Sequence, residues 1–178
     1  NNEQSIVSRT LEKYTRFSFG DMLTETILDP EGSAQKTITE YYPSSNIKNQ
    51  KSSNGRWEFY SYDNNKRTLI YNTPFKNTNY TEGVVGVQSF EYGYVDSASD
   101  DRPRSITRKV NGTIVGKTFN TYSTSGNRRT ETIEVATMPS AQAGNASNLK
   151  TTKVYDIQTD RLISVTHPDG KLETYTYE

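Results

Sequence analysis

One short pattern recurs along this chain and constrains its fold more than any other feature. It consists of a turn with a glycine, a strand rich in β-branched and aromatic residues, and one or two tyrosines. The clearest copy is 162–178, LISVTHPDGKLETYTYE. Pro168 holds φ at about −65°, which suits the first corner of a type I turn. Gly170 can take the positive φ that a three-residue hairpin loop with a G1 bulge requires. The segment therefore predicts a β-hairpin.

Degenerate copies of this hairpin precede it. Each has a turn glycine followed by a strand and then by tyrosine; the glycines are Gly32, Gly55, Gly86 and Gly112, and the tyrosines that follow them are Tyr41-Tyr42, Tyr60 and Tyr62, Tyr92 and Tyr94, and Tyr122. Successive tyrosine landmarks are 20 residues apart from Tyr42 to Tyr62 and 22 apart from Tyr155 to Tyr177. Periods of about 20–50 residues are typical of repeat arrays, in which each repeat buries surface against its neighbours.

The C-terminal copies carry a family resemblance. Its motifs are Val154-Tyr155-Asp156, Asp160-Arg161-Leu162, Pro168-Asp169-Gly170 and Tyr175-Thr176-Tyr177. Together they resemble the Rhs/YD-repeat family, although Asp160 stands where that family usually has glycine. The resemblance implies a bacterial protein that is secreted or lies at the cell surface. In large members of the family many repeats wind into a shell around a toxic C-terminal domain. This chain holds too few repeats for a closed shell, so we expect a fragment of a larger protein.

Composition favours a thin sheet over a thick aliphatic core. Leu, Ile, Val and Phe together make up 33 of 178 residues, whereas there are 13 tyrosines, one tryptophan and a formal net charge of zero. Tyrosine buries a large ring while its hydroxyl stays hydrated or hydrogen-bonded. No cysteine is present. No run of about 18 apolar residues occurs either, so we expect no membrane span.

We predict an all-β fold in which tandem β-hairpins form one curved antiparallel sheet, open or partly rolled, as a single domain over 1–178. Asn111-Gly112 is a strong signal for a type I′ turn. Residues 2–19 favour a strand over a helix. Four polar or flexible segments predict loops: 43–54, 74–82, 96–104 and 138–148.

Aromatic residues on one strand supply the first candidate site. Trp57 with Tyr60 and Tyr62 is able to form a platform on which sugar rings stack. The alternative is that these rings pack across neighbouring strands, which is the commoner use of such residues. If the ring of Tyr175 packs and is buried, Tyr175→Ala is expected to lower the free energy of unfolding by about 3–5 kcal/mol.

Basic residues supply the second candidate site. Arg102, Arg104 and Arg108 cluster in the sequence and suit an anionic glycan or a phosphate group, although alternating charges on an exposed sheet face explain them equally well. Zero net charge and the absence of a recognition helix argue against nucleic acid as a partner.

Catalytic and metal-binding signals are weak. His167 is the only histidine, and its position beside Pro168 is typical of a surface turn. Asp96, Asp100 and Asp101 lack the spacing of an EF-hand, and an acidic solvated loop accounts for them. We therefore predict no catalytic residue, no cofactor and no metal site.

These observations lead to three functional hypotheses. The first is a non-enzymatic structural or binding segment of a bacterial surface or secreted YD-repeat protein. Its partners would be neighbouring repeats of the same chain, and a glycan or a surface protein. The second is a carbohydrate-binding module with an aromatic platform. The third is a glycan-active enzyme, because paired carboxylates can come from distant strands.

Overall fold

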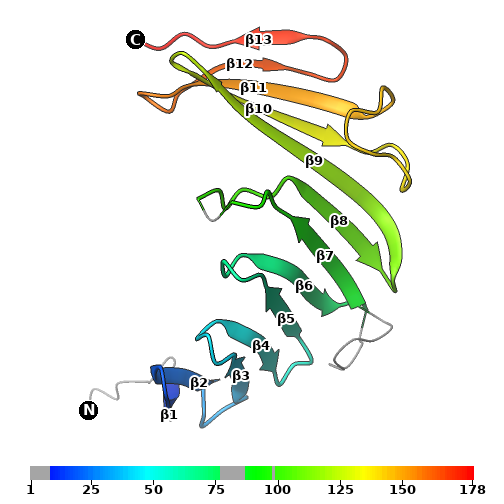
Figure 1. Cartoon of the computed structure of the whole chain (residues 1–178). Helices are drawn as coiled ribbons and strands as arrows, with labels where there is room; N and C mark the ends of the chain where they lie inside the picture. The colour runs from blue at the N-terminus through cyan, green and yellow to red at the C-terminus, as the bar shows by residue number, and fades with distance from the viewer. Residues whose placement is uncertain (1–8, 77–86, 98) are drawn as a thin grey trace, which may run out of the picture. The chain divides into compact units, whose positions relative to one another are not determined.

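The computed structural model describes residues 9–76, 87–97 and 99–178, and in these ranges it contains thirteen strands and no helix (Figure 1). The strands form one open antiparallel sheet in which each strand lies beside its neighbours in the sequence. This confirms the predicted all-β fold with consecutive hairpins. The strands are β1 (Thr10–Phe17), β2 (Gly20–Leu28), β3 (Gln35–Tyr41), β4 (Ile47–Ser52), β5 (Trp57–Tyr62), β6 (Thr68–Pro74), β7 (Val87–Gly93), β8 (Ser105–Val110), β9 (Thr113–Ser125), β10 (Arg128–Val135), β11 (Leu149–Asp156), β12 (Leu162–Thr166) and β13 (Leu172–Thr174).

The chain divides into two compact units. Unit 1 comprises residues 1–89 and 110–112, and unit 2 comprises 90–109 and 113–178. Unit 1 contains β1–β6, and unit 2 contains β9–β13. The single domain expected from the sequence stays a prediction. No helix in the ranges given above is long and apolar enough to cross a membrane.

The turn predicted at 168–170 is confirmed in detail. The backbone N–H of Gly170 donates to the carbonyl of His167, and the N–H of His167 donates to the carbonyl of Lys171, both at 2.9 Å. Gly170 has a φ of 82°. This is the hydrogen-bond pattern of a type I turn followed by a G1 bulge, and it joins β12 to β13.

The same backbone geometry recurs in three turns of unit 1. Each pairs an i to i+3 bond with a second bond between residues i and i+4, and the residue with positive φ is Ser45 (69°), Gly55 (86°) or Lys66 (63°). Two of these three residues are not glycine. A search for turn glycines therefore finds only part of the repeat.

One predicted loop is wrong. Segment 43–54 contains β4, which pairs with β3 on one side and with β5 on the other. Its sequence, IKNQKS, is mostly polar, with Ile47 as its one β-branched residue and no aromatic residue to reveal a strand. Ladder hydrogen bonds from two neighbouring strands override this weak local preference. Segment 138–148 and the described residues of 96–104 contain no strand, as predicted, and part of 74–82 lies outside the described residues.

Of the glycines expected to supply the positive φ of a turn, Gly32 does not do so, whereas Gly112 does. The turn before β3 contains Asp29 with a φ of 53°, while Gly32 is not in a left-handed conformation. A Cβ on Gly32 would lie 2.2 Å from a carboxylate oxygen of Asp29, so a larger residue there would force the Asp29 side chain to move. Asn111 and Gly112 have φ values of 51° and 77°, which confirms the type I′ turn. Gly86 lies outside the described residues.

The sheet has little deeply buried apolar surface. Among the described residues the buried apolar side chains are Trp57, Ala141 and Val165. Most tyrosines are half-buried, as expected for a thin sheet. Tyr14, Tyr175 and Tyr177 are exceptions at 58%, 42% and 47% exposure, so the condition set for a large effect of Tyr175→Ala, a buried ring, is not met. Tyr175 and Tyr177 follow β13, which lies at the edge of the sheet order and has β12 as its one neighbour among the described strands.

Candidate functional site

The aromatic candidates in unit 1 pack against one another. The ring of Tyr60 stacks on Tyr71, with centroids 5.1 Å apart, and on Tyr62, with centroids 6.4 Å apart. Tyr62 in turn meets the ring of Tyr42 edge to face at 6.1 Å, and the Tyr42 hydroxyl donates to the carbonyl of Tyr60 at 3.0 Å. Cross-strand packing therefore engages Tyr60 and Tyr62.

A carboxylate joins two of these rings. The hydroxyls of Tyr60 and Tyr71 donate to the two oxygens of Glu58 at 2.6 and 3.1 Å. Burial raises the pKa of Tyr60 well above the usual range, and its hydrogen bond to Glu58 and the charge of that carboxylate raise it further. Burial also raises the pKa of Tyr62. The two phenols thus remain neutral donors at physiological pH.

Trp57 does not present an open ring. It begins β5 and is 4% exposed, so its indole faces cannot receive a sugar ring as a flat exposed platform would. It pairs across the sheet with Lys51 of β4. Burial of the one tryptophan makes it part of the packing in unit 1.

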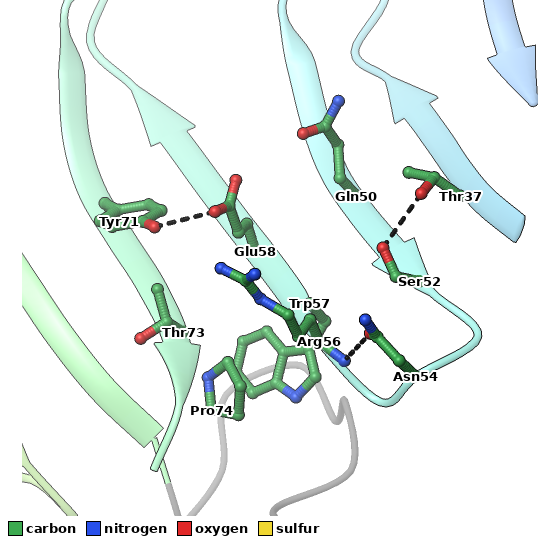
Figure 2. A pocket seen from close by; sticks show the side chains of 10 residues that line it. All are labelled: Thr37, Gln50, Ser52, Asn54, Arg56, Trp57, Glu58, Tyr71, Thr73 and Pro74. Carbon is green, nitrogen blue, oxygen red and sulfur yellow. Dashed lines mark hydrogen bonds between the residues drawn. The ribbon is translucent and has the colours of Figure 1, made fainter. Parts of the chain in front are cut away.

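Trp57 does line a polar hollow, which we call the β3–β6 hollow (Figure 2). It has a volume of about 410 Å³ and lies within unit 1. Its described lining residues are Thr37, Gln50, Ser52, Asn54, Arg56, Trp57, Glu58, Tyr71, Thr73 and Pro74. Glu58 is the only carboxylate among these lining residues. Sequence reasoning identified Trp57 but missed the polar residues around it, because Thr37, Gln50 and Thr73 come from separate strands.

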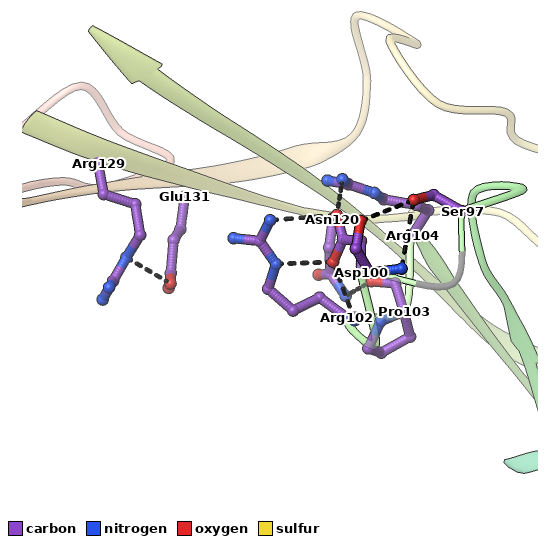
Figure 3. A network of polar contacts seen from close by, with 9 residues as sticks. Ser97, Asp100, Arg102, Pro103, Arg104, Asn120, Arg129 and Glu131 are labelled. Carbon is purple, nitrogen blue, oxygen red and sulfur yellow. Dashed lines mark hydrogen bonds and ion pairs between the residues drawn. The ribbon is translucent and has the colours of Figure 1, made fainter. Parts of the chain in front are cut away.

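Two of the basic candidates in unit 2, Arg102 and Arg104, form an ion-paired cluster (Figure 3). Arg102 grips the carboxylate of Asp100 with Nε and Nη2, at 2.9 and 3.1 Å. Arg104 donates to the same carboxylate from Nη2 at 2.5 Å. The hydrogen bonds from Arg102, its charge and that of Arg104 lower the pKa of Asp100 to about 2. Asp100 therefore accepts three N–H bonds from these two arginines and offsets one unit of their charge.

The same two arginines lie over an aromatic ring. The guanidinium carbons of Arg102 and Arg104 are 4.4 and 4.7 Å from the ring centroid of Tyr122 on β9. The side chain amide of Asn120 donates to the carbonyl of Pro103 at 3.1 Å and anchors the same loop. Arg108 lies further along on β8 with an exposed side chain. The cluster thus fastens the loop before β8 to β9.

A second arginine–tyrosine pair follows on the next strands. Arg129 of β10 is the register partner of Tyr155 of β11, and its guanidinium carbon is 4.6 Å from that ring centroid. Arg129 also pairs with Asp160 at 2.9 Å and lies 3.4 Å from Glu131. Arg161 lies over Tyr177 at 5.0 Å. Sequence reasoning missed this series, although an arginine precedes each of Tyr122, Tyr155 and Tyr177 in the sequence.

The acidic loop holds no metal-binding group. Within 9–76, 87–97 and 99–178, no group of three or more His, Asp or Glu side chains is placed to hold a metal ion. Asp100 forms ion pairs with Arg102 and Arg104, and Asp96 and Asp101 are exposed.

Comparison with known proteins adds no family assignment. No protein-family model matches this chain, and no curated protein matches it.

Proposed function

We propose that this chain is a non-catalytic structural segment of a larger bacterial surface or secreted protein of the YD-repeat type. The observation that carries the proposal is the strand order, in which every strand lies beside its sequence neighbours. Such an arrangement is extended by adding hairpins at an edge, and each hairpin is stabilised mainly by those beside it.

The side-chain contacts support the same role. In unit 2, Arg102 and Arg104 on Tyr122 and Arg129 on Tyr155 join residues that are close in strand order. They take the place that a thick apolar core has in an ordinary globular domain. Basic residues paired with acidic and aromatic neighbours in this way stabilise the sheet.

The two alternatives have less support. Trp57 is too buried to serve as the sugar-stacking platform of a carbohydrate-binding module of that kind. Glycoside hydrolysis generally needs a pair of carboxyl groups flanking the scissile bond. The described lining of the β3–β6 hollow includes one carboxylate, Glu58, whose oxygens accept two tyrosine hydroxyls.

Hydrogen exchange tests the nearest-neighbour character of the scaffold. Gly170→Val places a β-branched residue at a φ of 82° and strains the last hairpin. We expect faster amide exchange in β12 and β13 and unchanged exchange in β2–β5. Asp169→Asn, in the same turn, serves as the matched control and should leave both regions unchanged. Faster exchange throughout the sheet would contradict a scaffold of semi-independent hairpins.

A further inference from the structure

The β3–β6 hollow contains a cation that the packing of unit 1 does not use. Arg56 lies between the Gly55 turn and β5 and lines the hollow. Its backbone N–H donates to the side-chain oxygen of Asn54 at 3.0 Å. Within the described part of the chain, its guanidinium has no hydrogen-bond or ion-pair partner, and the side chain is exposed. By contrast, Arg67 of the following turn is paired with Asp63 at 2.7 Å.

The nearest acid along the strand is otherwise engaged. Glu58 shares a strand face with Arg56, because the two are separated by one residue on the β5 side of the turn. Its oxygens accept the hydroxyls of Tyr60 and Tyr71. Arg56 lines the hollow and does not pair with Glu58. Its planar set of N–H donors therefore remains available to a ligand.

Neutral polar groups make up most of the remaining wall. Gln50 donates to Thr39 at 3.3 Å, which leaves its side-chain carbonyl as an acceptor. The Asn54 amide uses its oxygen on Arg56 and keeps its NH₂ group as a donor. The side-chain hydroxyl of Thr73 has no hydrogen-bond partner within the residues that the structure describes. The hollow therefore offers both donors and acceptors, which suits ligand hydroxyls that both donate and accept.

We propose that the β3–β6 hollow binds a sugar ring that carries a carboxylate, a hexuronic acid residue of an acidic glycan. Arg56 pairs with the carboxylate, and Gln50, Asn54 and Thr73 contact the ring hydroxyls. Guanidinium and carboxylate match in planar geometry and form charge-assisted hydrogen bonds. A volume of about 410 Å³ suits a small ligand, since such pockets span roughly 300–1,000 Å³.

The charge of the hollow selects against simpler anions. Arg56 and Glu58 leave it near neutral, so a phosphate dianion gains one favourable and one unfavourable charge contact. A monoanionic sugar can place its carboxylate on Arg56 and its hydroxyls on the hydroxyl and amide groups of the other lining residues. Recognition here uses hydrogen bonds and charge, with Trp57 and Pro74 as an apolar wall. This inference does not rest on the scaffold role proposed above.

Titration of the full 178-residue chain with a linear trimer of galacturonic acid tests the proposal. Binding is measured by calorimetry and by changes in NMR chemical shifts. The neutral galactose trimer and inorganic phosphate are the ligand controls. We expect the acidic trimer to bind and both controls to bind at least tenfold more weakly. Equal binding of the neutral trimer, equal binding of phosphate, or no binding of the acidic trimer would overturn the proposal.

Two variants locate the site. Arg56→Gln should weaken binding of the acidic trimer roughly tenfold or more, because a charge-assisted pair is lost. Arg128→Gln removes an exposed arginine from β10 in unit 2 and is the matched control, with unchanged binding expected. Thr73→Val should weaken the acidic trimer by a smaller factor. Tryptophan fluorescence and circular dichroism check that each variant is folded. Retention of full affinity in folded Arg56→Gln would place any binding elsewhere.

Discussion

Replacing Ser45 by glycine is expected to stabilise this protein. Ser45 occupies the left-handed position of the β3–β4 turn, with a φ of 69°. An L-residue there costs about 1–2 kcal/mol through the contact of Cβ with the following carbonyl. Glycine removes that cost but loses about 0.5–1 kcal/mol more backbone entropy on folding. The net gain in the free energy of unfolding is about 0.5–1 kcal/mol.

The reciprocal exchange provides the internal check. Gly170 occupies the equivalent position of the β12–β13 turn, and a Cβ added there meets no atom within 4 Å. Gly170→Ser should therefore lose about as much free energy of unfolding as Ser45→Gly gains, through backbone strain alone. Ser44→Gly lies in the same turn as Ser45 but without positive φ, so it should destabilise the protein.

Urea denaturation measures these changes. With a slope of about 1–3 kcal/mol per molar urea, a gain of this size moves the midpoint upward by roughly 0.2–1 M for Ser45→Gly. The slope should stay constant, which shows that stability and not compactness has changed. A lower midpoint for Ser45→Gly, or an unchanged midpoint for Gly170→Ser, would refute the idea that turn conformation limits the stability of these hairpins.

Two further predictions follow from burial and from charge. Trp57→Ala should cost about 3–5 kcal/mol in thermal or urea unfolding because the ring is buried, whereas Tyr175→Ala, at 42% exposure, should cost clearly less; equal losses would contradict the burial pattern. The folded-state pKa of Asp100 is about 2, below its ordinary value of 3.8, so its ion pairs with Arg102 and Arg104 stabilise the protein above about pH 4. That contribution should be lost as the pH falls toward 2, and Asp100→Asn should flatten this part of the stability profile; an identical acid transition in wild type and variant would count against it.

Local sequence chemistry was sufficient to predict most hairpins. Pro168 and Gly170 predicted a turn whose hydrogen bonds the structure confirms, and Asn111-Gly112 predicted the type I′ turn between β8 and β9. The reason is that proline, glycine and asparagine each restrict or widen the accessible φ at a single residue. β4 escaped prediction because its strand conformation depends on hydrogen bonds from β3 and β5, which its own residues do not encode.

The candidate sites were harder to predict than the fold. Sequence position brought Arg102 and Arg104 together correctly but gave no sign that Asp100 and Tyr122 would engage both. Pairing across strands decides such contacts, and it depends on register. Bulges displace that register by one residue at several points, including Ser61/Tyr62, so small errors change which side chains meet.

By itself, the amino-acid sequence determined that this protein is a succession of antiparallel hairpins with a thin, tyrosine-rich packing. Turn preferences and β-propensity act over a few residues, so they can be read along the chain. Only the tertiary structure decided that Trp57 is buried, that Asp100 pairs with both arginines near it, and that Arg56 faces a polar hollow without a partner among the described residues. These outcomes depend on which strands and side chains become neighbours, and that is settled by the register of the whole sheet.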